Sequence, residues 1–135
     1  MITSYRLQVR FSDCDMLQHV NNAVYLSYFE EARIHYFRQL VGIHWDWNKT
    51  GILLRKNELE YIKPVFLHDP VEIAVYLKHL GDKSFTLAYE VLVNGEVRTI
   101  GTSVLVCFDN TIKQSIKIPE LMRKGLERLE LKLDQ

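Results

Sequence analysis

Two carboxylates, a histidine and two asparagines lie close together near the start of the chain, just before an apolar helix pattern. Asp13, Asp15 and His19 can exchange protons or act on an electrophilic carbon, and Asn21 and Asn22 follow directly. The start of a helix points unpaired N–H groups and the positive end of the helix dipole outward. A carboxylate near that end can act on a carbonyl group that these N–H groups polarise. This combination is the minimal equipment for acyl transfer or hydrolysis.

The spacing alone does not separate the roles of the two carboxylates. Asp15 is expected to act as a general base or nucleophile, and Asp13 competes for the same role. For either one, a solvated loop residue or a helix-cap accessory is the ordinary alternative, because structural carboxylates far outnumber catalytic ones. His19 is expected to orient a substrate or to assist proton transfer. Its alternative is a loop histidine bonded to the backbone.

The periodicity of apolar residues predicts the elements that must position these groups. Apolar and polar residues alternate over 5–11, which is typical of a half-buried strand, and a loop follows over 12–21. Asn21 or Asn22 is the expected N-cap of the next helix. The remaining expected elements are a long amphipathic helix from Tyr25 to Leu40 that ends at Gly42, strands over 52–62, 71–78, 84–93 and 97–108, and a helix from Pro119 to about Leu131.

The order of these elements predicts the fold class. One strand and one long helix precede four strands, which we expect to form an antiparallel meander. Asn94-Gly95 between two of them is a strong hairpin signal. One helix on one face of a sheet is an α+β arrangement. We therefore expect a single domain over 1–135, with a five-stranded antiparallel sheet curled around one central helix and a short C-terminal helix.

The composition excludes several classes of protein. Lys and Arg together number 17, as do Asp and Glu, so the chain lacks the basic field that nucleic-acid binders use. Cys14 and Cys107 match no metal or redox spacing, which suits a reducing compartment. No signal-peptide pattern and no bilayer-length apolar run are visible. We expect a cytoplasmic protein with no membrane and no nucleic-acid partner.

Three other chemistries also lack support in the sequence. The histidines other than His19 are scattered over different elements, so no metal ion is expected. No serine lies in a Gly-x-Ser-x-Gly elbow, and no glycine-rich phosphate loop is present. We expect no cofactor.

The motifs together resemble those of hotdog-fold acyl-CoA thioesterases of the 4-hydroxybenzoyl-CoA thioesterase family. The resemblance covers nearly the whole chain, and its first motif is the specific one. The matching stretches are Phe11-x-Asp13-x-Asp15, His19-Val20-Asn21-Asn22-x-x-Tyr25, Phe29-Glu30-x-Ala32-Arg33, Tyr61-Ile62-Lys63-Pro64 with Pro70-Val71-Glu72-Ile73, and Lys83-Ser84-Phe85.

The resemblance implies an enzyme that hydrolyses an acyl-CoA or acyl-carrier thioester. It implies a homodimer as the minimum unit, often assembled into a homotetramer, with active sites at the subunit interface. The family's catalytic aspartate falls on Asp15 rather than Asp13, and the N–H that polarises the carbonyl falls near Asn22. Lys83 matches a position at the nucleotide end of coenzyme A. The substrate-binding residues that the resemblance implies are His19, Asn22, Tyr25, Lys83 and Ser84.

The chain departs from the family in two places. Gly81-Asp82 stands where some members carry arginines before the lysine, and the variant around His19 differs from the branch that hydrolyses the aromatic thioester. The aromatic substrate is therefore not carried over. The basic residues that could replace the missing arginines are Arg55, Lys56, Lys63 and Lys113. Trp45, Trp47 and Tyr28 could control the depth of an acyl tunnel.

Two alternatives to thioester hydrolysis stay open. Hydratases and dehydratases of enoyl and hydroxyacyl thioesters share the fold and pair an aspartate with a histidine, but the spacing from Asp15 to His19 is one residue shorter here. A module that binds acyl-CoA without catalysis would keep the fold and the ligand. Fold alone does not decide among the three.

Overall fold

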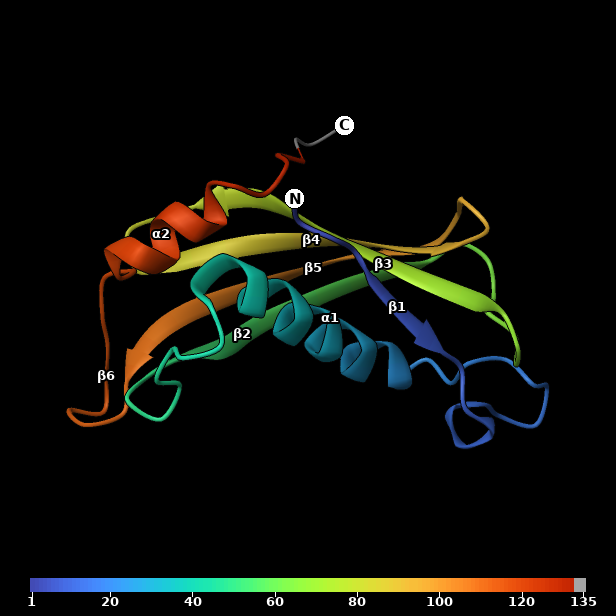
Figure 1. Cartoon of the computed structure of the whole chain (residues 1–135). Helices are drawn as coiled ribbons and strands as arrows, with labels where there is room; N and C mark the ends of the chain where they lie inside the picture. Colours follow the sequence, from blue (N-terminus) through green and yellow to red (C-terminus); the bar gives the residue numbers. More distant parts are fainter. Residues whose placement is uncertain (133–135) are drawn as a thin grey trace. The chain divides into compact units, whose positions relative to one another are not determined.

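The computed structural model describes residues 1–132 of the chain, and Figure 1 shows its helices and strands. In chain order the elements are β1 (Tyr5–Gln8), the 3-10 turn η1 (Phe11–Asp13), α1 (Val24–Val41), β2 (Thr50–Tyr61), β3 (Pro70–Leu80), β4 (Ser84–Val93), β5 (Glu96–Asp109), β6 (Gln114–Ser115) and α2 (Glu120–Leu126). Within the described residues, neither helix combines the length and apolar character needed to cross a bilayer.

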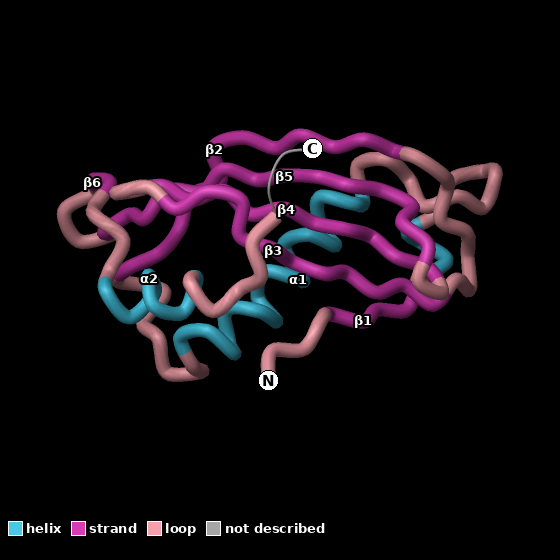
Figure 2. Tube along the Cα trace, turned by 90° about the horizontal axis from the view of Figure 1, so that it is seen from above, coloured by secondary structure: helices cyan, strands magenta, loops and turns pink. Residues whose placement is uncertain are grey.

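The sheet confirms the expected fold class, but the expected four-strand meander is wrong. The strand order is β1-β3-β4-β5-β2, with β6 paired to β5, as Figure 2 shows. Asn94 and Gly95 both have positive φ, which suits the tight hairpin between β4 and β5. The connection over 62–69 contains Pro64 and is longer than a tight hairpin, so it carries the chain from β2 at one edge to β3 across the sheet.

Two element ends differ from the sequence prediction for identifiable reasons. Strand β1 stops at Gln8, because the N–H of Asp13 bonds to the carbonyl of Arg10 and turns the chain into η1. Helix α2 stops at Leu126, because the following segment pairs with β3 instead. The N–H of Leu77 donates to Glu130 at 2.9 Å, and the N–H of Lys132 donates to Leu77 at 2.9 Å.

The contacts divide the chain into two compact units. The first contains Met1–Tyr36, Leu59–Val75 and Tyr89–Gly101, and the second contains Phe37–Glu58, Tyr76–Ala88 and the chain from Thr102 onward. In the first unit, the ring of Phe29 stacks on Tyr89 with centroids 4.2 Å apart. The buried guanidinium of Arg33 donates to the hydroxyl of Tyr89 at 3.0 Å. Every Tyr and Phe residue of α1 is buried, as expected for one face of an amphipathic helix: Tyr25, Tyr28, Phe29, Tyr36 and Phe37.

In the second unit, aromatic side chains and helix α2 pack against the C-terminal end of α1. The ring of Phe37 meets those of Trp47 and Phe85 edge-on, at 5.5 and 6.1 Å. The buried Cys107 thiol lies 3.6 Å from the sulfur of Met122 on α2. Both cysteines are free.

Gly125 on α2 lies against the backbone of α1 so closely that a side chain does not fit. A Cβ at Gly125 would lie 2.7 Å from the carbonyl oxygen of Leu40 and 3.0 Å from its Cβ. Gly125→Ala should therefore force the helices apart and lower the free energy of unfolding by about 1–3 kcal/mol. Denaturant titration measures this. Lys124→Ala, at an exposed position of the same helix, should change it by less than about 0.5 kcal/mol; an equal loss in both variants would contradict the packing argument.

Candidate active site

Asp13 is a buried structural residue rather than an available base. Its carboxylate is 3% exposed and accepts hydrogen bonds from the backbone N–H of Arg10 at 3.0 Å, the guanidinium of Arg10 at 3.0 Å and the hydroxyl of Tyr28 at 2.7 Å. Burial alone would raise the pKa of Asp13, but the hydrogen bonds from Arg10 and Tyr28 outweigh it and lower the pKa. Asp13 thus anchors the loop to Arg10, two residues beyond β1, and to Tyr28 on α1.

Asp15 lies two residues further, at the start of a tight exposed turn. The N–H of Gln18 donates to the carbonyl of Asp15 at 3.0 Å, and the N–H of Asp15 donates to the carbonyl of His19 at 2.9 Å. One carboxylate oxygen, Oδ1, accepts the N–H groups of Leu17 and His19 at 2.9 and 3.3 Å. Its Oδ2 has no hydrogen-bond donor among residues 1–132. One oxygen fixes the side chain, and the other is available to a substrate or a water molecule.

The turn that carries Asp15 is held by the connection between β2 and β3. The N–H of Val20 donates to Val65 at 2.8 Å, and the N–H of Leu67 donates to Gln18 at 3.1 Å. The ring of His19 meets that of Phe66 edge-on at 4.8 Å. His19 is thereby fixed on the inner side of the turn, half-buried.

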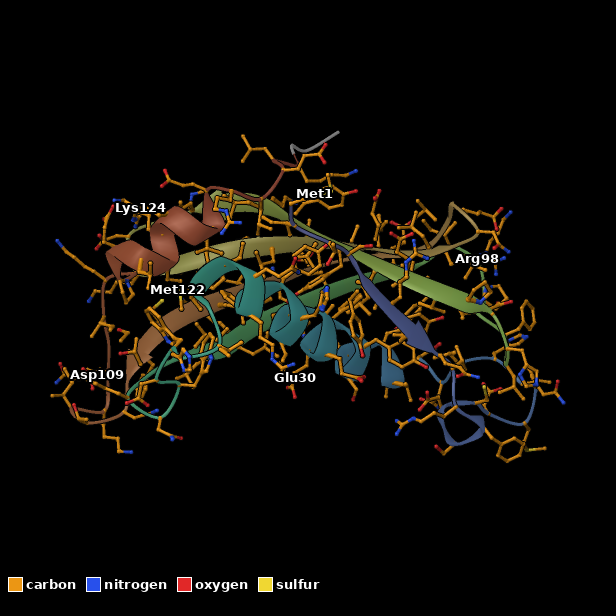
Figure 3. The ribbon with its side chains drawn as sticks, in the orientation of Figure 1. Met1, Glu30, Arg98, Asp109, Met122 and Lys124 are labelled. Carbon is orange, nitrogen blue, oxygen red and sulfur yellow. The ribbon has the colours of Figure 1, made fainter. Side chains whose placement is uncertain are left out.

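Arg98, labelled in Figure 3, in turn fixes that connection to β5. Its guanidinium donates to the carbonyl of Pro64 at 2.7 Å and lies 3.6 Å from the carboxylate of Asp69. Its own carbonyl accepts the N–H groups of Ile62 and Lys63, both at 2.9 Å. The sequence gives no indication of this role, because an arginine in a strand carries no local signal of a structural function.

Asn21, one of the two residues expected to cap this helix, holds the turn that leads into α1. Its side-chain Oδ1 accepts the N–H of Ala23 at 3.0 Å, and its carbonyl accepts the N–H of Val24 at 2.9 Å. Its own N–H donates to the carbonyl of Asp13 at 2.9 Å. This turn therefore connects the start of α1 directly to the loop of the two aspartates.

Among the backbone groups of residues 21–23, one has no hydrogen-bond partner within residues 1–132. The carbonyl of Asn22 accepts the hydroxyl of Tyr61 at 2.8 Å, and the carbonyl of Ala23 accepts the N–H of Leu26 at 3.3 Å. In the described part of the chain, the N–H of Asn22 donates to no acceptor, and Asn22 is exposed. It is the available donor among the backbone groups of residues 21–23.

Tyr25, one of the expected substrate-binding residues, is buried in the core. Its side chain is 2% exposed, and its ring meets those of Tyr28 and Tyr61 edge-on at 6.1 and 5.1 Å. Burial raises the pKa of Tyr25. In the single chain, the buried ring of Tyr25 supports the start of α1 through these ring contacts.

Lys83 and Ser84 belong to the second unit, in the turn between β3 and β4. The N–H of Gly81 donates to the carbonyl of Ser84 at 2.8 Å, and Lys83 is exposed. The guanidinium of Arg123 on α2 donates to the carbonyl of Gly81 at 2.6 Å. The turn that presents Lys83 is therefore fixed by a cation from the C-terminal helix, which the sequence did not indicate.

Two of the basic residues named as substitutes already have acidic partners. The ammonium of Lys63 lies 2.8 Å from Glu96, and that of Lys56 lies 2.6 Å from Glu58.

No group of three or more side chains able to hold a metal ion occurs in residues 1–132. An open hollow of about 540 Å³ adjoins the Asp13 anchor, and it is lined by Gln8, Val9, Arg10, Phe11, Leu67 and His68.

An antiparallel sheet with one long helix and a short C-terminal helix is the hotdog arrangement found in thioesterase structures. The model of the thioesterase-like superfamily matches residues 9–126, and the chain belongs to this superfamily. It is a thioesterase.

Three relatives illustrate the match. A thioesterase from Thermus thermophilus, crystallised with coenzyme A and Zn, is 38% identical, with a TM-score of 0.82 over 94% of this chain and 92% of that one. The long-chain acyl-CoA thioesterase FadM from Escherichia coli K12 is 26% identical over 92% of this chain and 96% of its own length. The uncharacterised YsmA from Bacillus subtilis 168 is 33% identical, and that match spans 62% of this chain and 56% of YsmA.

Proposed function

We propose that the chain hydrolyses acyl-CoA thioesters to a free acid and coenzyme A, with Asp15 as the catalytic carboxylate. The observation that carries the proposal is the contrast between the two aspartates: Asp13 is buried and fully bonded, whereas Asp15 is exposed with Oδ2 available. The turn before α1 offers the N–H of Asn22, which donates to no acceptor in residues 1–132. FadM is a long-chain acyl-CoA thioesterase, and the Thermus relative was crystallised with coenzyme A, which supports this substrate class.

The proposed reaction uses these two groups on the same thioester carbon. The N–H of Asn22 binds the oxyanion that forms on the carbonyl oxygen, a contribution of up to roughly 2.7–4 kcal/mol. In one route Asp15 takes a proton from a water molecule, whose oxygen attacks the carbon. The C–S bond then breaks, and the thiolate leaves with that proton. In the other route the Asp15 carboxylate attacks, expels the thiolate and forms a mixed anhydride that water hydrolyses. Both routes use the same two groups.

The other proposed substrate contacts are assigned by position. His19, fixed against Phe66, would orient the thioester from the side of the turn. Tyr25 would form the inner wall of the acyl pocket, since it is buried. Lys83 and Ser84 would contact the coenzyme A end, with Lys83 attracting phosphate.

We also propose a cytoplasmic homodimer or homotetramer with active sites at the subunit interface. In the single chain, large apolar side chains in the Asp15 turn and just before it in the sequence are exposed, with Phe11 81%, Met16 99% and Leu17 71% exposed. Exposed large apolar side chains, where they gather, mark surfaces that a partner covers. A second copy over this surface would exclude water from the thioester and strengthen every charge interaction there.

A thiol-release assay across short, medium, long and aromatic acyl-CoAs tests the proposed function. We expect thiol release with at least one aliphatic chain length. Crotonyl-CoA, followed for hydration of its double bond, serves as the comparison. Hydration without thiol release, or no thiol release from any member of the series, would contradict the proposal.

The turn at Lys83 gives a separate prediction about the coenzyme. Lys83→Ala and Arg123→Ala should raise KM for acyl-CoA about three- to tenfold, because the first removes a charge and the second releases the Gly81 carbonyl. KM for the matching acyl-pantetheine, which lacks the nucleotide, should not change. The control is Lys124→Ala, an exposed cation on the same helix, labelled in Figure 3. An equal rise in KM for both substrates would contradict a contact with the nucleotide.

A further inference from the structure

The peptide group between Asn22 and Ala23 is held at both ends. Its carbonyl oxygen accepts the hydroxyl of Tyr61 at 2.8 Å, and its N–H donates to the side chain of Asn21 at 3.0 Å. The two partners come from different parts of the chain, since Tyr61 ends β2 and Asn21 ends the aspartate loop. A peptide group bonded at both ends cannot rotate without breaking one of these bonds.

The direction of the N–H of Asn22 depends on the two peptide groups that flank Asn22, and the group between Asn22 and Ala23 is one of them. That N–H belongs to the preceding peptide group, whose carbonyl oxygen, on Asn21, is bonded to the N–H of Val24. With both flanking peptide planes fixed, the φ and ψ angles of Asn22 are fixed as well. The N–H of Asn22 therefore has one direction, which is what stabilisation of an oxyanion requires.

Tyr61 is itself well placed to act as a support. Its ring meets the buried ring of Tyr25 at 5.1 Å, and the next two residues, Ile62 and Lys63, bond to the carbonyl of Arg98. Burial raises the pKa of Tyr61, so the hydroxyl keeps the proton that it donates.

We propose that Tyr61 and Asn21 are positioning residues that together orient the N–H of Asn22 toward the thioester carbonyl. The inference rests on the proposed thioesterase function and adds two residues to it. Neither side chain touches the reacting atoms. Their effect is to keep the donor aligned before the substrate arrives, so that no reorganisation is needed in the transition state.

Tyr61→Phe removes only the hydroxyl and keeps the ring contact with Tyr25. We expect kcat for acyl-CoA to fall about tenfold, with KM changed less than about twofold, because the hydrogen bond from Asn22 to the oxyanion strengthens in the transition state. Tyr5→Phe is the matched control, since the Tyr5 hydroxyl also ends on a surface hydrogen bond, to Glu31 at 3.2 Å. It should keep wild-type kcat and KM. Wild-type kcat in a folded Tyr61→Phe protein would overturn the proposal.

A spectroscopic measurement separates positioning from a general loss of structure. With acyl-CoA carrying a ¹³C-labelled carbonyl bound to the Asp15→Asn protein, the infrared carbonyl band should shift to lower frequency than in water. Adding Tyr61→Phe should reverse part of that shift. A loss of kcat without any change in this band would show that Tyr61 acts only on stability, and would also overturn the proposal.

The hydrogen bond from the N–H of Ala23 to the side chain of Asn21 gives a second test that does not depend on Tyr61. Asn21→Ala removes the acceptor of the Ala23 N–H and should lower kcat by a similar factor, whereas Asn21→Asp keeps an acceptor and should restore most of it. If Asn21→Ala retains wild-type kcat, Asn21 is not needed to orient the N–H of Asn22, and the proposal is wrong for this residue. The proposed function fails separately, through absence of thiol release by the wild-type protein.

Discussion

Asp15→Asn is expected to lower kcat for acyl-CoA by about 10²- to 10⁴-fold, the contribution usually made by a positioned general base. The amide of asparagine can neither accept a proton from water nor attack a thioester. Its oxygen can still accept the N–H groups of Leu17 and His19, so the turn should keep its shape. The carboxylate is exposed, and its replacement should leave the melting temperature nearly unchanged.

The matched control for this prediction lies two residues earlier. Asp13→Asn should lower kcat much less than Asp15→Asn, because Asp13 is enclosed by Arg10 and Tyr28. Steady-state thiol release measured on both folded proteins decides between the two aspartates. A larger loss of kcat at position 13 than at 15, with both proteins folded, would reverse the assigned roles.

The second large effect is on stability, and it arises at Asp13. Asp13→Asn should lower the free energy of unfolding by about 1–3 kcal/mol, since an amide nitrogen would face the donors of Arg10 and Tyr28 in a buried site. Tyr28→Phe removes one of these donors and should cost less. Denaturant titration of the two single variants and the double variant measures the coupling. Full additivity would contradict a direct interaction between Asp13 and Tyr28.

The same residue predicts how stability changes with pH. The hydrogen bonds to Asp13 lower its pKa in the folded protein below the ordinary value of 3.8. The stability that they provide is therefore complete above the pKa of the unfolded chain and is lost as the pH falls through the lower, folded pKa. Compared with wild type, Asp13→Asn should lose less of its free energy of unfolding between about pH 4 and pH 2. A parallel decline in both proteins would contradict this contribution.

Much of the fold was predictable because local patterns specify it. The spacing of aromatic residues along α1 indicates its buried face, and Asn94-Gly95 specifies the hairpin between β4 and β5. The position of β2 was not predictable in this way. It pairs with β5, and just beyond its end Ile62 and Lys63 bond to Arg98 on β5, so the pairing joins residues far apart in the sequence.

The candidate site was predictable in its residue types but not in its division of roles. Periodicity and spacing treat Asp13 and Asp15 alike, and only the contacts with Arg10 and Tyr28 separate them. The role of Tyr61 was invisible for the same reason, because its hydroxyl reaches Asn22 from 39 residues away. Local sequence therefore indicated the motif, and the tertiary contacts distinguished its anchor from its available carboxylate.

A crystal structure of the Asp15→Asn protein with an intact acyl-CoA tests the central claim most directly. We predict that the thioester carbonyl oxygen lies about 3 Å from the N atom of Asn22, with the side chain at position 15 beside the thioester carbon. A thioester bound with its carbonyl directed away from Asn22, or far from position 15, would contradict the account.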